Sequence, residues 1–296
     1  MRIAITGASG LIGTALTNEL RKQEHEVIPI SRTKAKGTIV WDIANKTIDK
    51  ESLEGVDAVV HLAGENITGL WTAQKKRRIE RSRIESTDLL ATTLPNLKKP
   101  PHTVVSASAI GYYGLQPGEV DESAPPGKSF LAGVCTSWEA AAKPLKDAGI
   151  RVVHPRISMV LAREGGALKQ MLPSFKLGAG AKLGNGKQGM SWIALDDVAR
   201  AIAYLLEQPT CDGAYNLSAP GIVNNAEFTK TLAGVLRRPS LFSVPEMILK
   251  AAAGDLASEL LLNDIRAYPK RLQEAGFAFT YPELRPALES LLQDCS

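Results

Sequence analysis

A glycine-spaced turn near the N-terminus constrains the fold of this chain more than any other feature. The segment Thr6-Gly-Ala-Ser-Gly-Leu-Ile-Gly13 follows a short apolar run and opens an amphipathic stretch. Gly7 permits a tight turn, Gly10 lets the backbone approach a pyrophosphate, and Gly13 lets the helix pack close to the sheet. Unpaired N–H groups and the helix dipole there favour negative charge. The predicted dinucleotide-binding residues of this turn are Gly7, Ser9, Gly10, Leu11, Ile12 and Gly13.

Short apolar runs and longer helical patterns alternate along the first 165 residues. Predicted strands cover residues 2–6, 26–30, 38–41, 58–62, 103–106 and 151–155, and predicted helices cover 11–22, 74–94 and 132–147. Strands that alternate with helices require crossover connections, which produce a parallel sheet with helices on both faces. The expected fold class is α/β, a Rossmann-type doubly wound parallel sheet with a smaller, helix-rich C-terminal lobe.

The pattern changes after Pro155, and the length of 296 residues also suggests two domains. We expect a dinucleotide-binding domain at 1–165, to which 190–220 returns, and a substrate-binding C-terminal lobe at 166–189 and 221–296. The glycine- and lysine-rich stretch 176–189 predicts a loop or hairpin whose Lys176, Lys182 and Lys187 would meet an anionic substrate. The next strand, 192–195, is expected to lead into a helix capped by an aspartate of the pair 196–197.

The end of the second predicted strand indicates which dinucleotide binds. An acidic side chain there would accept hydrogen bonds from a ribose 2′-OH and select NAD. The chain instead reads Ile28-Pro-Ile-Ser-Arg-Thr-Lys34, without an acid. The Ser31 hydroxyl and the Arg32 guanidinium suit a 2′-phosphate, which arginine binds through two parallel hydrogen bonds. NADP(H) is therefore the predicted cofactor.

Two further segments bear on the cofactor. Leu62, Ala63 and Gly64 follow the fourth predicted strand, where small residues line the cofactor crevice of such a sheet. The segment 75–83 is a dense basic helix that ends in Arg83, and one of its arginines would reach back to the cofactor. A nucleic-acid surface would carry interleaved aromatic residues and a large net charge, whereas the formal net charge is only +4. We therefore expect no nucleic-acid partner.

Cysteine usage and hydropathy indicate the compartment. Cys135, Cys211 and Cys295 are odd in number and widely spaced, which fits neither a disulfide framework nor a metal-binding knuckle. They are typical of reduced thiols. The sequence shows no signal-peptide pattern and no run of about 18 apolar residues. We expect a cytoplasmic protein with no metal site and no membrane partner.

Together these motifs resemble the extended short-chain dehydrogenase/reductase superfamily, and in particular its bacterial YfcH-type epimerase-family proteins. The resemblance covers essentially the whole chain. Its segments are 6–13, 62–66, 82–83, Ser108-Ala-Ile-Gly-Tyr-Tyr-Gly114, 138–142, 192–193 with 196–197, 224–228 and 269–277. It implies a Rossmann domain that binds NADP(H), and a C-terminal lobe of unassigned role that closes over it. The cofactor shell that it implies contains Ser31, Arg32, Leu62, Ala63 and Arg83.

The usual catalytic device of this superfamily is missing. Active members use a Ser or Thr that polarises the substrate, and a Tyr-x-x-x-Lys pair on the next helix whose lysine lowers the tyrosine pKa. Ser108 fits the first role. Its distance along the chain puts Cys135 at the position of the tyrosine and Glu139 at that of the lysine. Lys143 is expected to form an i, i+4 ion pair with Glu139.

Three interpretations of the site therefore stay open. Tyr112 or Tyr113 is the proton donor, Cys135 and Glu139 form a different pair, or the site binds NADP(H) without turnover. The main hypothesis is an NADP(H)-dependent oxidoreductase or nucleoside-diphosphate-sugar epimerase-like enzyme, which acts on an anionic small molecule or a sugar nucleotide. The alternative is a non-catalytic NADPH-sensing protein, regulatory or related to cell division, that passes the cofactor state to a protein partner.

Overall fold

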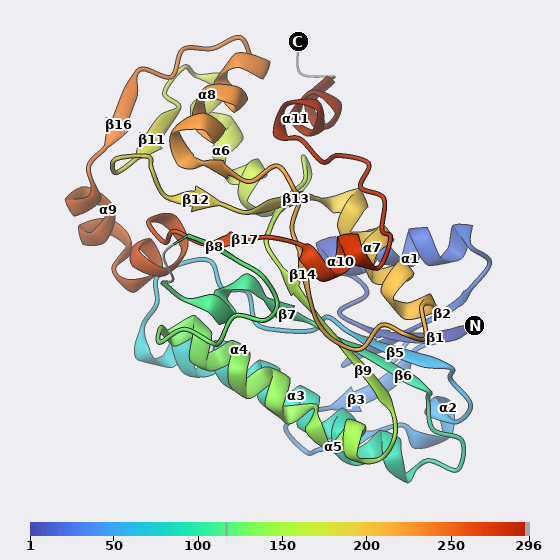
Figure 1. Cartoon of the computed structure of the whole chain (residues 1–296). Helices are drawn as coiled ribbons and strands as arrows, with labels where there is room; N and C mark the ends of the chain where they lie inside the picture. Colours follow the sequence, from blue (N-terminus) through green and yellow to red (C-terminus); the bar gives the residue numbers. More distant parts are fainter. Residues whose placement is uncertain (116–117, 294–296) are drawn as a thin grey trace.

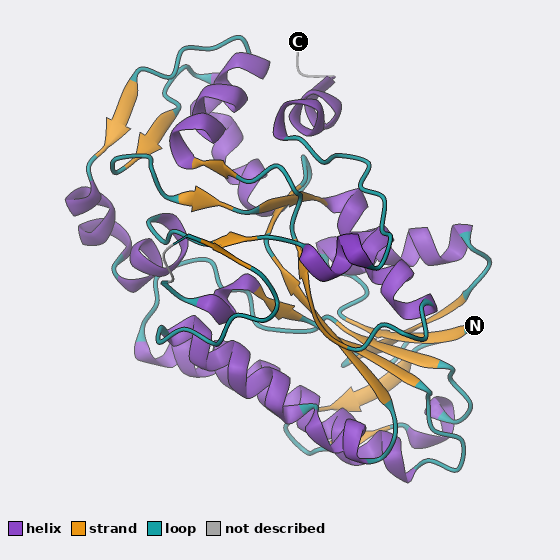
Figure 2. Ribbon diagram, in the orientation of Figure 1, coloured by secondary structure: helices purple, strands orange, loops and turns teal. Residues whose placement is uncertain are grey.

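The computed structural model, which describes residues 1–115 and 118–293, is built on a large twisted sheet (Figures 1 and 2). The strand order is β14-β9-β6-β5-β1-β2-β3-β4, and all neighbours in it are parallel except β3 and β4. The direction in which successive strands are added to the sheet reverses between β1 and β5, and open α/β sheets bind ligands at such a point. The strands are β1 (Arg2–Thr6), β2 (Glu26–Ser31), β3 (Ile39–Asp42), β4 (Thr47–Ile48), β5 (Ala58–His61), β6 (Thr103–Ser106), β9 (Arg151–Ile157) and β14 (Gly213–Leu217), with β7 (Ser108–Ala109) beside β9.

Helices cover both faces of the sheet, which confirms the doubly wound α/β prediction. One face carries α1 (Leu11–Lys22) and α7 (Leu195–Glu207), and the other carries α3 (Ala73–Thr93), α4 (Phe130–Ala141) and α5 (Lys143–Asp147); α2 (Lys50–Leu53) and the 3₁₀ turn η1 (Leu94–Asn96) are short connectors. Side chains of β1 alternate between the two cores. Ile3 and Ile5 pack with Leu16 and Leu20 of α1, whereas Ala4 belongs to the core on the α3 side.

A smaller lobe lies beyond the carboxyl edge of the sheet (Figure 1). Its core joins Phe175, Trp192, Phe228 and Leu288. Its helices are α6 (Gly166–Lys176), α8 (Asn225–Val235), α9 (Glu246–Ala253), α10 (Lys270–Glu274) and α11 (Leu284–Leu292), with a π turn, η3 (Ala257–Leu261). Four two-stranded pairs tie distant segments together: β10 (Met159–Leu161) with β13 (Trp192–Ala194), β11 (Ala181–Leu183) with β16 (Phe242–Val244), β12 (Gly189–Met190) with β15 (Val223–Asn224), and β8 (Glu119–Val120) with β17 (Arg266–Ala267).

Two local predictions were wrong, and the structure decides between the alternatives of a third. The helix predicted at 132–147 is two helices, because Pro144 has no N–H for the intrahelical bond and interrupts the ladder. Of the two alternatives for 176–189, the hairpin is excluded, since β11 pairs with β16 and β12 pairs with β15, and the rest of the stretch after α6 is loop. The N-cap of α7 is Ala194, without a side-chain cap. Asp197 instead accepts the N–H groups of Thr280 and Tyr281, both at 2.9 Å, and so anchors the C-terminal segment.

Candidate functional site

The glycine turn forms a cradle made of backbone. Gly7 has a φ of +69°, and a Cβ there would lie 3.0 Å from the amide nitrogen of Ala63. A Cβ on Gly13 would lie 2.1 Å from the carbonyl oxygen of Gly7, which no side chain tolerates. Gly10 is the N-cap of α1 and offers no side-chain cap, so the first N–H groups of the helix are left for a ligand. This cradle fits a pyrophosphate.

A buried hydroxyl beneath the turn holds the segment that follows β5. Thr6 Oγ1 accepts the N–H groups of Leu62 (3.0 Å) and Ala63 (3.1 Å). The same oxygen lies 2.7 Å from His61 Nδ1. Since both lone pairs of the hydroxyl are used by the two amides, its proton goes to His61 Nδ1. Leu62 and Ala63 are therefore fixed directly beside Gly7.

The His61 ring completes this hydrogen-bonded chain. Its Nε2 lies 3.0 Å from Ser86 Oγ, and the Ser86 hydroxyl donates to the carbonyl oxygen of Ser82 at 2.6 Å. This pattern assigns the ring proton to Nε2. Complete burial, with a smaller effect from the Arg83 charge, lowers the pKa of His61 to about 3. The ring is therefore neutral, and through Thr6 it helps to fix the segment that contains Leu62 and Ala63.

The residues predicted around the 2′-phosphate lie at the end of β2. Ser31 is the last residue of the strand, and its hydroxyl accepts the N–H of Thr33 at 3.1 Å. Arg32 is exposed. In the described part of the chain its guanidinium has no carboxylate partner, so it is available to a phosphate.

The Arg83 side chain packs beside Gly64. Its Nη1 donates to the carbonyl oxygens of Ile79 (2.9 Å) and Glu65 (3.2 Å). Its Cζ lies 3.4 Å from where a Cβ on Gly64 would be and 5.1 Å from the Trp138 ring centroid. Burial lowers the pKa of this guanidinium.

The rest of the basic helix is largely committed to contacts within the chain. Lys75 binds Glu65 at 2.8 Å, Lys76 binds Asp255, and Arg81 binds Glu85 at 2.7 Å. These ion pairs give the helix a role within the fold.

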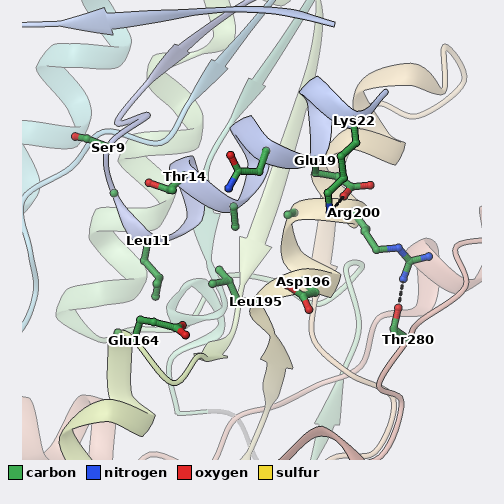
Figure 3. A pocket seen from close by; sticks show the side chains of 15 residues that line it. Ser9, Leu11, Thr14, Glu19, Lys22, Glu164, Leu195, Asp196, Arg200 and Thr280 are labelled. Carbon is green, nitrogen blue, oxygen red and sulfur yellow. Dashed lines mark hydrogen bonds and ion pairs between the residues drawn. The ribbon is translucent and has the colours of Figure 1, made fainter. Parts of the chain in front are cut away.

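A cleft of about 740 Å³ runs along α1, from the glycine turn to Lys22, and faces the first turns of α7 (Figure 3). Ser9, Gly10 and Leu11 of the glycine turn line one side, and Glu164 and Asp196 lie opposite them. One end of the predicted phosphate cradle therefore faces open space. None of the predicted catalytic residues lines this cleft.

Ser108, Glu139 and Arg156 form a cluster that includes two of the positions expected to correspond to catalytic residues of the superfamily. Ser108 Oγ donates to Glu139 Oε1 at 2.7 Å. Arg156 binds both carboxylate oxygens, through Nε and Nη2, at 2.9 Å each. Burial acts to raise the pKa of Glu139, but the hydrogen bonds and charge of Arg156 outweigh it, so the pKa lies below its usual value. The Ser108 proton is used within the cluster and is not presented to a substrate.

The predicted partner of Glu139 was wrong. Lys143 binds Asp147 at 2.6 Å on the exposed side of the helix pair. Glu139 faces the sheet, where Arg156 of β9 reaches it. The negative charge of Glu139 is therefore neutralised by an arginine of the sheet and not by a lysine of its own helix pair.

The two tyrosines of the η2 turn (Ile110–Tyr113) have different surroundings. Tyr113 is fully buried; its hydroxyl donates to Asn216 Oδ1 at 2.7 Å and accepts from Arg156 Nη1 at 3.0 Å. Burial raises its pKa to about 12. Tyr112 is half-buried, with its ring centroid 3.4 Å from Arg156 Cζ. Its hydroxyl has no hydrogen-bond partner among the described residues and is the freer of the two.

Cys135 does not have the surroundings of a reactive thiol. It is buried on α4, and burial, reinforced by the Glu139 charge, raises its pKa to about 11. Cys211 is also buried and free, while Cys295 lies outside the described residues. The described residues contain no group of three or more His, Cys, Asp or Glu side chains that could hold a metal ion.

The C-terminal lobe reaches this cluster directly. Ile265 and Ala267 pack with Tyr113 and Val120, and β17 pairs with β8. Asn216 Nδ2 donates to the carbonyl oxygen of Tyr268 at 2.9 Å. The lobe therefore covers the side of the cluster opposite α4.

Arg156 and Asn216 are the members of the cluster that sequence reasoning missed. Arg156 directly follows the strand predicted at 151–155 and belongs to β9 in the structure. Buried arginines almost always have a partner, so its place beside a predicted buried strand was a usable signal. Asn216 carried no comparable signal.

Comparison with known proteins agrees with this geometry. Residues 3–218 match the model of the NAD dependent epimerase/dehydratase family, and residues 244–291 match a domain of unknown function, DUF1731. The chain belongs to the NAD-dependent epimerase/dehydratase family. An epimerase family protein of Mycobacterium bovis is 40% identical to it over 290 residues, 97% of this chain and 96% of the relative. Human SDR39U1 is 36% identical over 299 residues, 99% of this chain and all of the relative.

Solved structures of the epimerase family extend the comparison. The crystal structure of human SDR39U1 with NADPH is similar with a TM-score of 0.92 and 35% identity, over 99% of this chain and 100% of that one. A nucleoside-diphosphate sugar epimerase from Corynebacterium glutamicum gives a TM-score of 0.82 and 33% identity, over 99% of this chain and 58% of that one. The resemblance to an extended epimerase-family protein with a C-terminal domain of unknown function is thereby confirmed.

Proposed function

We propose that this protein binds NADP(H) at the carboxyl edge of its sheet, as an oxidoreductase or a nucleoside-diphosphate-sugar epimerase-like enzyme. The observation that carries the proposal is the glycine turn, where a Cβ at Gly13 would collide with the carbonyl oxygen of Gly7, and one at Gly7 would crowd the backbone of Leu62 and Ala63. The absence of an acid after β2, together with Ser31 and Arg32, supports NADP(H) over NAD(H). A 35% identical human relative was crystallised with NADPH. When bound, the nicotinamide supplies the hydride chemistry.

Each group of residues has its own task in this proposal. Ser9 and Gly10 shape the turn, in which the Gly10 N–H donates to the Gly7 carbonyl oxygen at 2.9 Å. Leu11, Ile12 and Gly13 hold the pyrophosphate on the free N–H groups at the start of α1, aided by the helix dipole. The segment at 62–64, held by Thr6, passes beneath the ribose and pyrophosphate, with Arg83 beside it.

Proton transfer in this proposal falls to Tyr112. Ser108 already donates its proton to Glu139, Tyr113 has both hydroxyl contacts satisfied, and the Cys135 thiol has a raised pKa. The Tyr112 ring stacks on the Arg156 guanidinium, and its hydroxyl has no hydrogen-bond partner in the part of the chain that the structure describes. The substrate is an anionic small molecule or a sugar nucleotide, bound between this edge and the C-terminal lobe at 166–189 and 221–296.

Cofactor selectivity tests the assignment of Arg32 to the 2′-phosphate of NADP(H). Titration of the full chain with NADPH and NADH, followed by protein fluorescence, should show tighter binding of NADPH. The Arg32→Ala variant should lose about tenfold or more in NADPH affinity with little change for NADH, because only NADPH carries the 2′-phosphate. Arg77→Ala, an exposed arginine on the basic helix, is the matched control. Equal losses for both cofactors in Arg32→Ala contradict the assignment.

Hydride exchange tests the proposed role of Tyr112 as the proton donor. Labelled NADPH is incubated with carbonyl compounds and sugar nucleotides, and transfer of the label is followed. Tyr112→Phe should abolish transfer while NADPH affinity stays unchanged. Full activity in Tyr112→Phe excludes Tyr112 as the proton donor.

A second candidate function is a non-catalytic NADPH sensor. The observation that favours it is a continuous hydrogen-bonded chain from Ser108 through Glu139, Arg156, Tyr113 and Asn216 to the C-terminal lobe. NADPH binding without exchange on any substrate, together with NADPH-dependent protection of 265–268 from hydrogen exchange, would favour the sensor over the enzyme.

We also propose that the protein works in the cytoplasm. The free thiols of Cys135 and Cys211 support a reducing compartment. No helix in the described residues is long and apolar enough to cross a membrane.

A further inference from the structure

Large apolar side chains gather on the outer edge of the C-terminal lobe, away from the cofactor site. Five of them are between 57% and 87% exposed, although each is of a kind that folding normally buries. Together they form what we call the outer edge, with the residues Leu177, Leu241, Phe242, Met247 and Ile248.

Three stretches of chain bring these side chains together. β11 and β16 pair in parallel, so that Ala181 lies beside Phe242. The turn after α6 packs on Pro239, since a Cβ on Gly178 would lie 3.5 Å from the Pro239 ring. A Cβ on Gly184 would lie 3.9 Å from Glu246 Cβ, at the start of α9. Figure 1 shows β11, β16 and α9 along one side of the lobe.

Helix α9 is the least supported element of this edge. None of its eight residues is buried. It holds one ion pair of its own, between Lys250 and Glu246. A helix this short is marginal unless its apolar face is packed, so α9 is a surface that gains stability from a partner.

Four cations surround the outer edge, in addition to the Lys250–Glu246 ion pair on α9. Lys176, Lys182, Arg237 and Arg238 are all exposed. In the part of the chain that the structure describes, none of these four has a carboxylate within ion-pair distance. These four side chains therefore place unpaired positive charge on the surface of the lobe, and a contact of Lys176 and Lys182 with a substrate stays a prediction.

We propose that the outer edge binds a partner protein through a segment that combines large apolar side chains with aspartates and glutamates. The apolar side chains of the segment cover the exposed leucine, phenylalanine and methionine side chains, and its carboxylates meet the four unpaired cations. A second copy of this chain does not fit, because a symmetric contact would place like charges opposite one another. The proposal does not depend on NADP(H) binding.

A pair of labelled peptides tests the charge requirement. One synthetic peptide alternates leucine or phenylalanine with glutamate, and its control has lysine in place of each glutamate. Fluorescence anisotropy with the full chain should show saturable binding of the acidic peptide only, and added salt should weaken it. Equal binding of both peptides, or no saturable binding of the acidic one, overturns the proposal.

Variants locate the binding surface. The double variant Lys182→Glu with Arg238→Glu should weaken acidic-peptide binding by more than tenfold, and so should Phe242→Ser with Met247→Ser. Leu70→Ser is the matched control, because Leu70 is 68% exposed but lies outside the outer edge. All variants should keep the wild-type NADPH affinity and unfolding midpoint. Unchanged peptide binding in both double variants places the contact elsewhere and refutes the proposal.

Two other occupants give distinct results. Binding to phosphatidylglycerol vesicles in preference to the acidic peptide, lost in the same double variants, would replace the protein partner by a membrane surface. Concentration-dependent dimerisation in sedimentation experiments, abolished by Phe242→Ser with Met247→Ser, would replace it by a second copy. Either result contradicts the proposal.

Discussion

The Glu139–Arg156 pair should contribute strongly to stability, and Glu139→Gln tests this. The substitution keeps the shape of the side chain and removes its negative charge. Arg156 is then left charged with its side chain only 5% exposed, and the Glu139 side chain is itself only 14% exposed. Removal of one partner of a buried ion pair costs about 3–5 kcal/mol, because the other charge stays buried without compensation. We expect about 3 kcal/mol, since the pair keeps slight contact with solvent.

Urea unfolding followed by circular dichroism measures this cost. With a denaturant slope of about 3 kcal/mol per molar for a large domain, the midpoint should fall by about 1 M. Asp147→Asn is the matched control, because it breaks the exposed pair with Lys143, whose side chains are 72% and 60% exposed. That variant should unfold at nearly the wild-type midpoint. Similar small shifts in both variants would refute the reasoning.

The pH dependence gives an independent check. The pKa of Glu139 in the folded protein lies below its ordinary value of 4.5. A carboxyl with a depressed folded pKa contributes stability above its unfolded pKa and loses it as the pH falls through the folded value. The difference between wild type and Glu139→Gln should therefore be full at pH 7 and shrink below about pH 4.5. A difference that persists unchanged at pH 3 would contradict this assignment.

Three further predictions follow from single contacts. Gly13→Ala should lower NADPH affinity at least tenfold and lower the thermal midpoint, because its Cβ would lie 2.1 Å from the Gly7 oxygen. Gly133→Ala is the control and should change neither quantity, because a Cβ there would have no atom within 4 Å. Cys135 should react with iodoacetamide at pH 8 far more slowly in the native protein than in urea, because its pKa is raised to about 11; equal rates would contradict its burial. Between pH 7 and pH 5 the wild type should lose stability more steeply than His61→Asn. The reason is that the pKa of His61 falls to about 3 on folding, so protonation of the unfolded chain in this range favours unfolding. Identical dependence of stability on pH in urea unfolding of the two proteins would count against a neutral buried ring.

Much of the fold could be read from local signals. The strands at 2–6 and 103–106 and the helix at 11–22 have their predicted bounds, because each combines a clear hydrophobic period with a turn or cap at its ends. The split of the helix predicted at 132–147 had a local cause in Pro144, whereas the pairing within 176–189 depends on partners distant in sequence. The strand at 181–183 exists because residues 242–244 lie beside it, and no local pattern indicates that pairing.

The site divides in the same way. The glycine cradle and the segment at 62–64 are local motifs, because short backbone distances demand particular residues at fixed spacing. The environment of Glu139 is not local. Its partners are Ser108 and Arg156, 31 and 17 residues away, and the nearer cation in sequence, Lys143, points elsewhere. A side chain on a helix can face several directions within one turn, so only the packed structure decides which charge it meets.

The sequence alone therefore determined the class of fold, the phosphate-binding turn and the lack of the tyrosine–lysine pair, because backbone sterics and residue identity act locally. The tertiary structure decided that Glu139 is neutralised by Arg156 and that Tyr113 is buried, while the Tyr112 hydroxyl has no hydrogen-bond partner among the described residues. It also decided that large apolar side chains stay exposed on the C-terminal lobe. Burial and charge pairing depend on segments brought together only when the sheet and the lobe have assembled.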